Sequence, residues 1–75
     1  MTPAPVILYV VAGCPYCERK RAELAAHGVA VTEIDVGARP EKIPELLKLT
    51  RGRRVVPVIV DAGGIAVAPE GGSGF

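Results

Sequence analysis

The first run of apolar residues in the chain predicts a buried strand. Residues 6–11 are Val-Ile-Leu-Tyr-Val-Val, an unbroken run that is rich in β-branched side chains. A strand with one solvated face alternates apolar and polar residues, whereas an unbroken run is typical of a strand covered on both faces, as in a parallel sheet. Gly13 interrupts the run, and Pro15 follows at a position that suits the first turn of a helix.

The residues after Pro15 predict an amphipathic helix that continues to about Ala26. Its apolar side holds Cys17, Leu24 and Ala25. The charged residues fall largely on the other sides of the helix: Glu18, Arg19, Lys20 and Glu23. His27 and Gly28 stand where the helix should end, because glycine readily adopts the left-handed backbone that closes many helices.

A second helix is predicted by the spacing of Ile43, Leu46 and Leu47, which continues to about Thr50. Pro44 fits this helix only within its first turn, where the missing N–H has no partner to lose. This helix lies between the segments 29–36 and 55–60, which are predicted to be strands.

Three more segments predict strands. Apolar residues recur through residues 29–36, and residues 55–60 are Val-Val-Pro-Val-Ile-Val, which is almost wholly aliphatic. The sequence Asp-Ala-Gly-Gly at 61–64 is a favourable turn, and it leads into a short fourth strand at 65–67.

The order strand, helix, strand, helix, strand, strand predicts a single α/β domain over residues 1–75, with a mixed four-stranded sheet. The first strand–helix–strand unit is expected to make a right-handed crossover between parallel strands, and the last two strands an antiparallel hairpin. The core of this domain is expected at about residues 5–68. Residues 69–75 hold three glycines and show no periodicity, which predicts a flexible tail.

Composition and charge narrow the function classes. The chain has 75 residues, of which 49% are hydrophobic and 23% charged, as in a small globular domain. Nine Lys and Arg against eight Asp and Glu give a net charge of +1, so we expect no bulk nucleic-acid binding. No apolar stretch reaches the roughly 20 residues of a membrane span, and we expect no membrane partner. We expect a cytoplasmic location, where paired thiols are more often catalytic or metal-binding than structural.

The two cysteines, Cys14 and Cys17, lie where the first predicted strand meets the first predicted helix. A bridge between them would close too short a loop to brace the fold. Free N–H groups and the dipole at the helix N-terminus stabilise a thiolate at Cys14, whereas Cys17 lies one turn further in and should keep a higher pKa. This asymmetry suits dithiol exchange, in which Cys14 attacks a disulfide and Cys17 resolves the mixed disulfide.

A metal site is the main alternative use of two thiols. A tetrahedral zinc site needs four ligands, and the only histidine, His27, lies ten residues beyond Cys17, which is about 15 Å along a helix. We therefore expect no metal within one chain, while a site shared between two chains remains open.

The motif Cys14-Pro-Tyr-Cys17 after a first strand, followed by Thr50-Arg-Gly-Arg-Arg-Val-Val-Pro57, resembles the glutaredoxins over about residues 5–67. The resemblance implies a thioredoxin-like fold and a thiol–disulfide oxidoreductase, with Cys14 as nucleophile and Cys17 as resolving thiol. It implies a cis Pro57 that faces the dithiol and a Val56 backbone that pairs with an extended glutathionyl or peptide substrate. The residues expected to bind substrate are Pro15, Tyr16, Arg53, Val56 and Pro57. For Arg53, which could approach a substrate carboxylate, an ordinary solvated turn is the alternative.

The sequence departs from the family pattern in three places. Val11 stands where a lysine is usual, and residues 66–70 lack the Gly-Gly and acidic pair that bind the γ-glutamyl end of glutathione. The last helix of the family is truncated or absent. The resemblance implies glutathione as co-substrate, no tightly bound cofactor, and glutathione or a disulfide-containing protein as partner. Two alternatives stay open: a carrier reduced by a flavin enzyme such as thioredoxin reductase, and a dimeric module that holds glutathione and a [2Fe–2S] cluster through Cys14.

Overall fold

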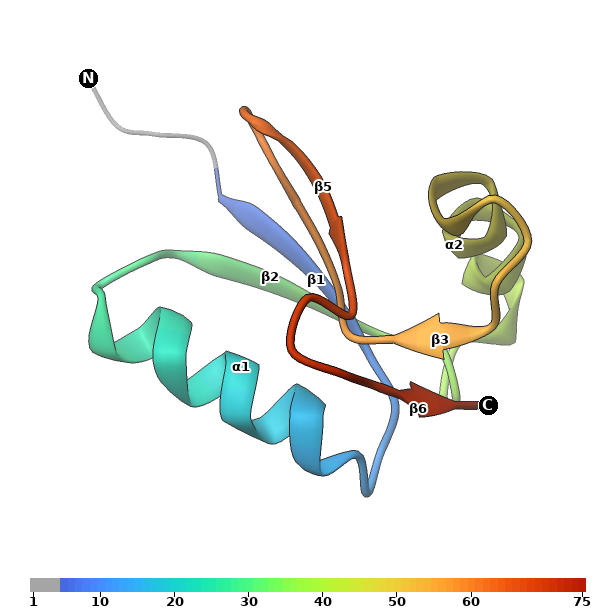
Figure 1. Cartoon of the computed structure of the whole chain (residues 1–75), viewed down its shortest axis with the longest axis horizontal. Helices are drawn as coiled ribbons and strands as arrows, with labels where there is room; N and C mark the ends of the chain where they lie inside the picture. The colour runs from blue at the N-terminus through green and yellow to red at the C-terminus, as the bar shows by residue number, and fades with distance from the viewer. Residues whose placement is uncertain (1–4) are drawn as a thin grey trace.

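A mixed four-stranded sheet forms the centre of the computed structural model, which describes residues 5–75 (Figure 1). The first four residues of the expected domain lie outside this range. The strand order in the sheet is β2-β1-β4-β5. The helical elements are α1 (Pro15–Ala26), the short 3-10 helix η1 (Pro40–Lys42) and α2 (Ile43–Thr50). The strands are β1 (Val6–Val10), β2 (Val31–Asp35), β3 (Val55–Val56), β4 (Val58–Asp61), β5 (Gly64–Val67) and β6 (Ser73–Gly74).

The sheet has the predicted mixed topology. Strand β1 runs parallel to β2 and antiparallel to β4, and β4 and β5 form the antiparallel hairpin. Helix α1 makes the crossover between β1 and β2, and Figure 1 shows α1 and α2 on opposite sides of the strands. The thioredoxin-like arrangement of the α/β domain is therefore confirmed.

The aliphatic runs recognised in the sequence form the core. The second half of β1 is buried on both faces of the sheet, since Leu8, Tyr9 and Val10 are all at most 2% exposed. Val36 and Leu46 are completely buried beside them. The apolar cluster also contains both cysteines and Val56, so the thiols are part of the core. Neither helix in residues 5–75 combines the length and the apolar character needed to cross a membrane.

Helix α1 differs from its prediction in the side chains that it buries. Cys17 is completely buried and Leu24 is half-buried, but Ala25 is exposed and Lys20 is largely buried. The stripe that faces the protein therefore follows positions 17, 20 and 24, as the helical period allows. A buried lysine is tolerated here because its Nζ donates to Glu23 at 2.7 Å and to Glu70 at 2.9 Å.

The third predicted strand is two strands in the structure. Strand β3 ends at Val56 and β4 begins at Val58, and the Val56-Pro57 peptide bond between them is cis. Pro57 has no N–H to contribute to a ladder, so it separates the two pairings: β4 joins the main sheet, and β3 pairs elsewhere.

Residues 69–75 have a defined course, which differs from the flexible tail that their composition predicts. Strand β6 pairs antiparallel with β3, with Val56 opposite Ser73 and Val55 opposite Gly74 (Figure 1). The glycines permit this approach, because a Cβ on Gly72 would lie only 2.3 Å from the carbonyl oxygen of Val56. A segment without large side chains can thus lie flat against β3.

Candidate active site

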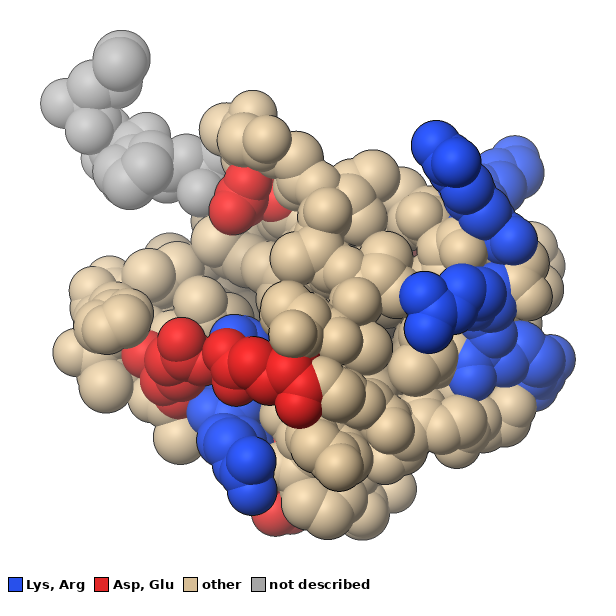
Figure 2. All heavy atoms as spheres, in the orientation of Figure 1, with Lys and Arg blue, Asp and Glu red and all other residues tan. Residues whose placement is uncertain are grey.

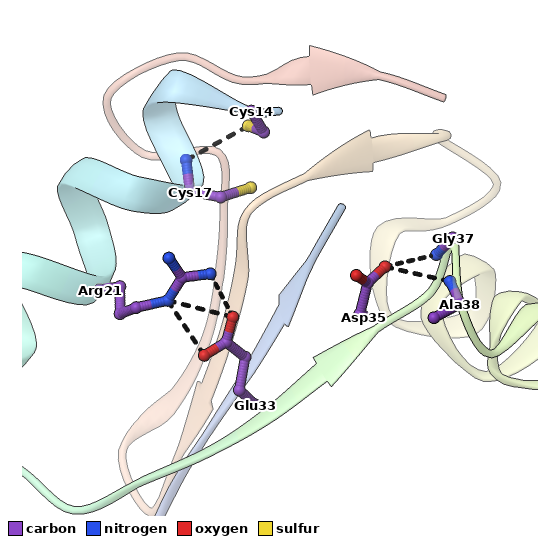
Figure 3. Close-up of polar contacts among 7 residues, drawn as sticks. All are labelled: Cys14, Cys17, Arg21, Glu33, Asp35, Gly37 and Ala38. Atoms are coloured by element: carbon purple, nitrogen blue, oxygen red, sulfur yellow. Dashed lines mark hydrogen bonds and ion pairs between the residues drawn. The ribbon is translucent and has the colours of Figure 1, made fainter. Parts of the chain in front are cut away.

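Cys14 is the N-cap of helix α1. Gly13, with a φ of 76°, turns the chain out of the region after β1, and Pro15 begins the helix. The Sγ of Cys14 accepts a hydrogen bond from the backbone N–H of Cys17 at 3.2 Å, as Figure 3 shows. The sulfur thus satisfies one of the free N–H groups of the first helical turn, which is the geometry expected from the Cys-Pro-Tyr-Cys spacing.

The pKa of the Cys14 thiol is lowered although the thiol is buried. Its burial, at 2% exposure, is the largest single influence and raises the pKa. Hydrogen bonds to the sulfur outweigh this effect: they come from the Cys17 thiol, the Ser73 hydroxyl and the backbone N–H groups of Cys17 and Tyr16. Because these donors bind the thiolate more strongly than the thiol, they favour ionisation.

The pKa of the Cys17 thiol moves in the opposite direction. Complete burial and the hydrogen bond to Cys14 raise this pKa to about 12. A backbone hydrogen bond from Val11 and the charge of Arg21 lower it, but less. Figure 3 shows Arg21 on the helix beyond Cys17, where it is held by the carboxylate of Glu33. The two thiols therefore differ in pKa in the direction expected from their places in the helix.

Val56 and Cys14 are brought together around Ser73. Ser73 lies opposite Val56 in the β3–β6 pair, and its hydroxyl is among the groups that lower the pKa of the Cys14 thiol. Val56 is completely buried in the same apolar cluster as both cysteines. Pro57 is also fully buried, and its carbonyl accepts the N–H of Ala68 at 2.8 Å. The cis bond implied by the family resemblance is present at Val56-Pro57.

Tyr16 and Pro15 occupy the exposed side of the first turn of α1. Tyr16 is 37% exposed, and the guanidinium of Arg19 lies 5.9 Å from the centre of its ring. The ring also contacts the glycines of the tail, because a Cβ on Gly71 would lie 2.9 Å from Tyr16 Cε1. Tyr16 thus stands between solvent and the segment that reaches Cys14.

Basic side chains are concentrated in residues 39–54, which include α2 and the turn after it. Residues 39–54 contain six basic and two acidic side chains, a formal charge of +4 in a chain of net charge +1. Figure 2 shows basic side chains gathered on the side of the molecule where α2 lies. Arg53 is exposed, and within residues 5–75 its side chain forms no ion pair. Arg54, by contrast, donates from Nε to the carbonyl oxygen of Phe75 at 2.7 Å.

The site contains residues that the sequence analysis did not select. Ser73 helps to lower the pKa of Cys14, and Glu70 accepts a hydrogen bond from Lys20 of α1. Both residues lie in the part of the chain expected to be flexible. The only signal in the sequence is the run Gly-Gly-Ser-Gly at 71–74, whose small residues can approach another backbone closely.

Other candidate sites lie apart from the thiols. A hollow of about 340 Å³ on the β4–β5 hairpin contains no thiol; it is lined by Asp61, Gly63, Gly64, Ile65 and Ala66. His27 caps the far end of α1. Across residues 5–75, no three metal-ligating side chains come together.

Comparisons with known proteins agree on one family. A family model for glutaredoxin matches residues 6–64, which include both cysteines and Val56-Pro57. The chain is 37% identical to glutaredoxin 3 of Escherichia coli K12 over 60 residues, which is 79% of this chain and 71% of the relative. It is 40% identical to a glutaredoxin of Pseudomonas aeruginosa over 55 residues (73% and 64%) and 34% identical to the Gene 56 protein of Mycobacterium phage L5 over 58 residues (77% and 56%). Strand β6 lies beyond the residues that the family model matches.

Proposed function

Because this chain belongs to the glutaredoxin family, we propose that it reduces disulfides by dithiol exchange through Cys14 and Cys17, with glutathione as its reductant. Family membership supports thiol–disulfide oxidoreductase activity in general. The observation that carries the assignment of the two roles is the opposite displacement of the two pKa values at adjacent sulfurs, lowered at Cys14 and raised to about 12 at Cys17.

In the first step, the Cys14 thiolate attacks one sulfur of the substrate disulfide. A bond forms between Cys14 Sγ and that sulfur, the substrate S–S bond breaks, and the other sulfur leaves as a thiolate that takes a proton from water. Only the thiolate is an effective nucleophile, so the donors around Cys14 raise the reactive fraction near neutral pH. The product of this step is a mixed disulfide on Cys14.

In the second step, Cys17 resolves the mixed disulfide. The Cys17 thiol loses its proton and attacks Cys14 Sγ, the substrate sulfur leaves with the bonding electron pair, and a Cys14–Cys17 disulfide remains. The high pKa of Cys17 keeps this thiol protonated until the first step has occurred. The attack becomes easier once Cys14 is no longer an anion, because the charge of Cys14 is among the influences that raise the pKa of Cys17.

Two molecules of glutathione then restore the dithiol. Together they supply two electrons and two protons to the Cys14–Cys17 disulfide and become one glutathione disulfide. No tightly bound cofactor enters these steps. The first step alone, in which Cys14 attacks the glutathione sulfur of a mixed disulfide between glutathione and a protein, would release the protein thiol.

We assign the substrate contacts to the surface around Cys14. In this proposal the backbone of Val56 pairs with an extended substrate beside Pro57, and Pro15 and Tyr16 line the exposed side of the cleft. Arg53 attracts a substrate carboxylate from the basic turn. The support is the burial of Val56 in the apolar cluster of both thiols and the positive charge of residues 39–54.

A carrier reduced by a flavin enzyme is the second candidate. The observation that favours it is Val11, which stands where the family usually has a lysine near the dithiol and is half-buried here. Without that charge, one attraction for the glutathione carboxylates is missing. This candidate uses the same chemistry at Cys14 and Cys17 and differs only in the source of electrons.

A comparison of two electron sources tests the proposal. Reduction of a small glutathionyl disulfide is measured with the protein and glutathione plus glutathione reductase, and then with the protein and thioredoxin reductase. We expect turnover with the first system and little with the second. Turnover with thioredoxin reductase alone would establish the carrier, and turnover with neither would reject glutathione-linked reduction.

A further inference from the structure

Residues 71–75, which we call the covering segment, lie along the edge of β3 beside the reactive thiol. Ser73 and Gly74 of this segment form β6, which pairs antiparallel with Val56 and Val55 (Figure 1). The backbone edge that an extended substrate needs for pairing is therefore already in use. The pairing partner is the chain itself.

Ser73 lies opposite Val56, where an extended substrate would pair. Its side chain is a single Cβ with one heteroatom, as in cysteine, and its hydroxyl is among the groups that lower the pKa of the Cys14 thiol. An extended peptide with cysteine in this register would therefore place its sulfur against Cys14. Serine gives the same placement without a bond that Cys14 could attack. The result is that Cys14 is only 2% exposed.

Contacts on both sides hold the covering segment in place. Next to Ser73, a Cβ on Gly72 would meet the Val56 carbonyl oxygen at 2.3 Å, so the two backbones are packed without space between them. At the far end, the carbonyl of Phe75 accepts from Arg54, whose guanidinium also lies 4.8 Å from the centre of the Phe75 ring.

The entry to the covering segment is fixed to helix α1. Glu70 accepts from Lys20 Nζ at 2.9 Å, and Gly71 lies against the ring of Tyr16. The hydrogen bonds that Lys20 donates to Glu23 and then to Glu70 raise its pKa, so its charge persists over the physiological range. Glu70 and Gly71 are both exposed, and a segment with few buried contacts can open locally without global unfolding.

We propose that the covering segment is an internal competitor of the substrate, and that an extended disulfide can react at Cys14 only after this segment leaves β3. The inference rests on the proposed function, because it assumes that the substrate pairs with Val56. It adds a closed state, in which Cys14 is covered, and an open state, in which the edge of β3 is free. The apparent affinity for substrate is then reduced by the fraction of molecules that are closed.

Two alanine variants form a matched test. Gly72→Ala introduces a methyl group that the closed state cannot hold, because it would overlap the Val56 carbonyl. Gly74→Ala makes the same chemical change two residues further on, where the Arg54 carbonyl oxygen would lie at an ordinary 3.6 Å from the added Cβ. We expect Gly72→Ala to shift the protein toward the open state and Gly74→Ala to behave as the parent.

The first measurement is alkylation of Cys14 by iodoacetamide in the reduced 75-residue chain. It is made at a pH above the pKa of Cys14 in every variant, so that only access to the sulfur differs. We expect Gly72→Ala to react roughly tenfold faster, as overpacking of a closed state predicts, with Gly74→Ala unchanged. Equal rates in the parent and a folded Gly72→Ala would overturn the proposal.

The second measurement is the KM for a glutathionyl peptide. A lower KM in Gly72→Ala supports competition, whereas a higher KM means that the segment belongs to the substrate site and rejects the proposal. If no variant turns the substrate over, the proposed function fails, while the alkylation rates still decide whether the segment covers Cys14. If Gly72→Ala does not fold, Glu70→Gln replaces it. This change removes the charge of Glu70 that pairs with Lys20, at a half-exposed position. The proposal then requires Glu70→Gln to be alkylated faster than the parent.

Discussion

The backbone N–H of Cys17 donates to the Sγ of Cys14 across 3.2 Å, which makes this sulfur the N-cap acceptor of helix α1. The pKa of the same thiol is also lowered by the hydroxyl of Ser73, which is far away in the sequence. One set of donors is thus local, built by three residues of sequence, and the other depends on how strand β6 meets β3. The predictions below separate these two contributions.

Replacement of Ser73 by alanine should raise the pKa of Cys14. The variant loses a group that lowers this pKa but keeps the backbone pairing of β6. Burial raises the pKa, and fewer hydrogen-bond donors then remain to offset it. The midpoint of the pH profile for Cys14 alkylation is then expected at higher pH than in the parent, with Gly74→Ala as the control. An unshifted midpoint would show that the local donors alone set the pKa.

The two cysteines should fail in different ways when each is changed to serine. Cys14→Ser should reduce disulfide reduction to the uncatalysed level, because a serine hydroxyl is not ionised at neutral pH. Cys17→Ser should accumulate a mixed disulfide on Cys14, since the resolving thiol is lost. Intact-protein mass spectrometry after exposure to glutathione disulfide shows which variant carries a glutathione adduct. A stable adduct on Cys17 in Cys14→Ser would reverse the assigned roles.

The free energy of unfolding of the reduced protein should fall as pH rises from about 9 to about 12. Folding raises the pKa of Cys17 to about 12, so over this range the folded state keeps a proton that the unfolded chain releases. Stability from this group is therefore full below the unfolded pKa and lost as pH approaches 12. Denaturant unfolding at several pH values, with Cys17→Ala as reference, isolates the effect. Parallel curves for the two proteins would contradict it.

Arg53→Gln should weaken binding of anionic substrate more than Arg51→Gln does. Both side chains are exposed on the same turn, and an exposed charge contributes modestly, so we expect KM for glutathione disulfide to rise about two- to fivefold in Arg53→Gln, with kcat unchanged. The difference should shrink as salt is added, because screening acts on exposed charges first. Equal effects at the two positions would assign the attraction to the whole basic turn.

The local sequence accounts for much of the geometry of the Cys14–Cys17 dithiol. The N-cap geometry forms whenever a helix starts at this motif. It needs a cysteine just before the helix, a proline at the first helical position and a second cysteine three residues after the first. The direction of both pKa displacements could be anticipated from this placement alone. The cis state of Val56-Pro57 was implied by the family resemblance rather than by any local pattern, since proline bonds are mostly trans.

The order of the four sheet strands and the two α-helices could be predicted from the sequence, because aliphatic runs and helical spacing report burial one element at a time. The reactive pair could be predicted too, since Cys14 and Cys17 are neighbours on one turn. The tertiary structure was needed to show that Lys20 faces inward and that Ser73 pairs with Val56. Both features depend on partners far along the chain: Glu70 lies 50 residues from Lys20. Such long-range contacts produce no hydrophobic periodicity in the sequence, because the positions of small and polar residues depend on the distant backbone against which they pack.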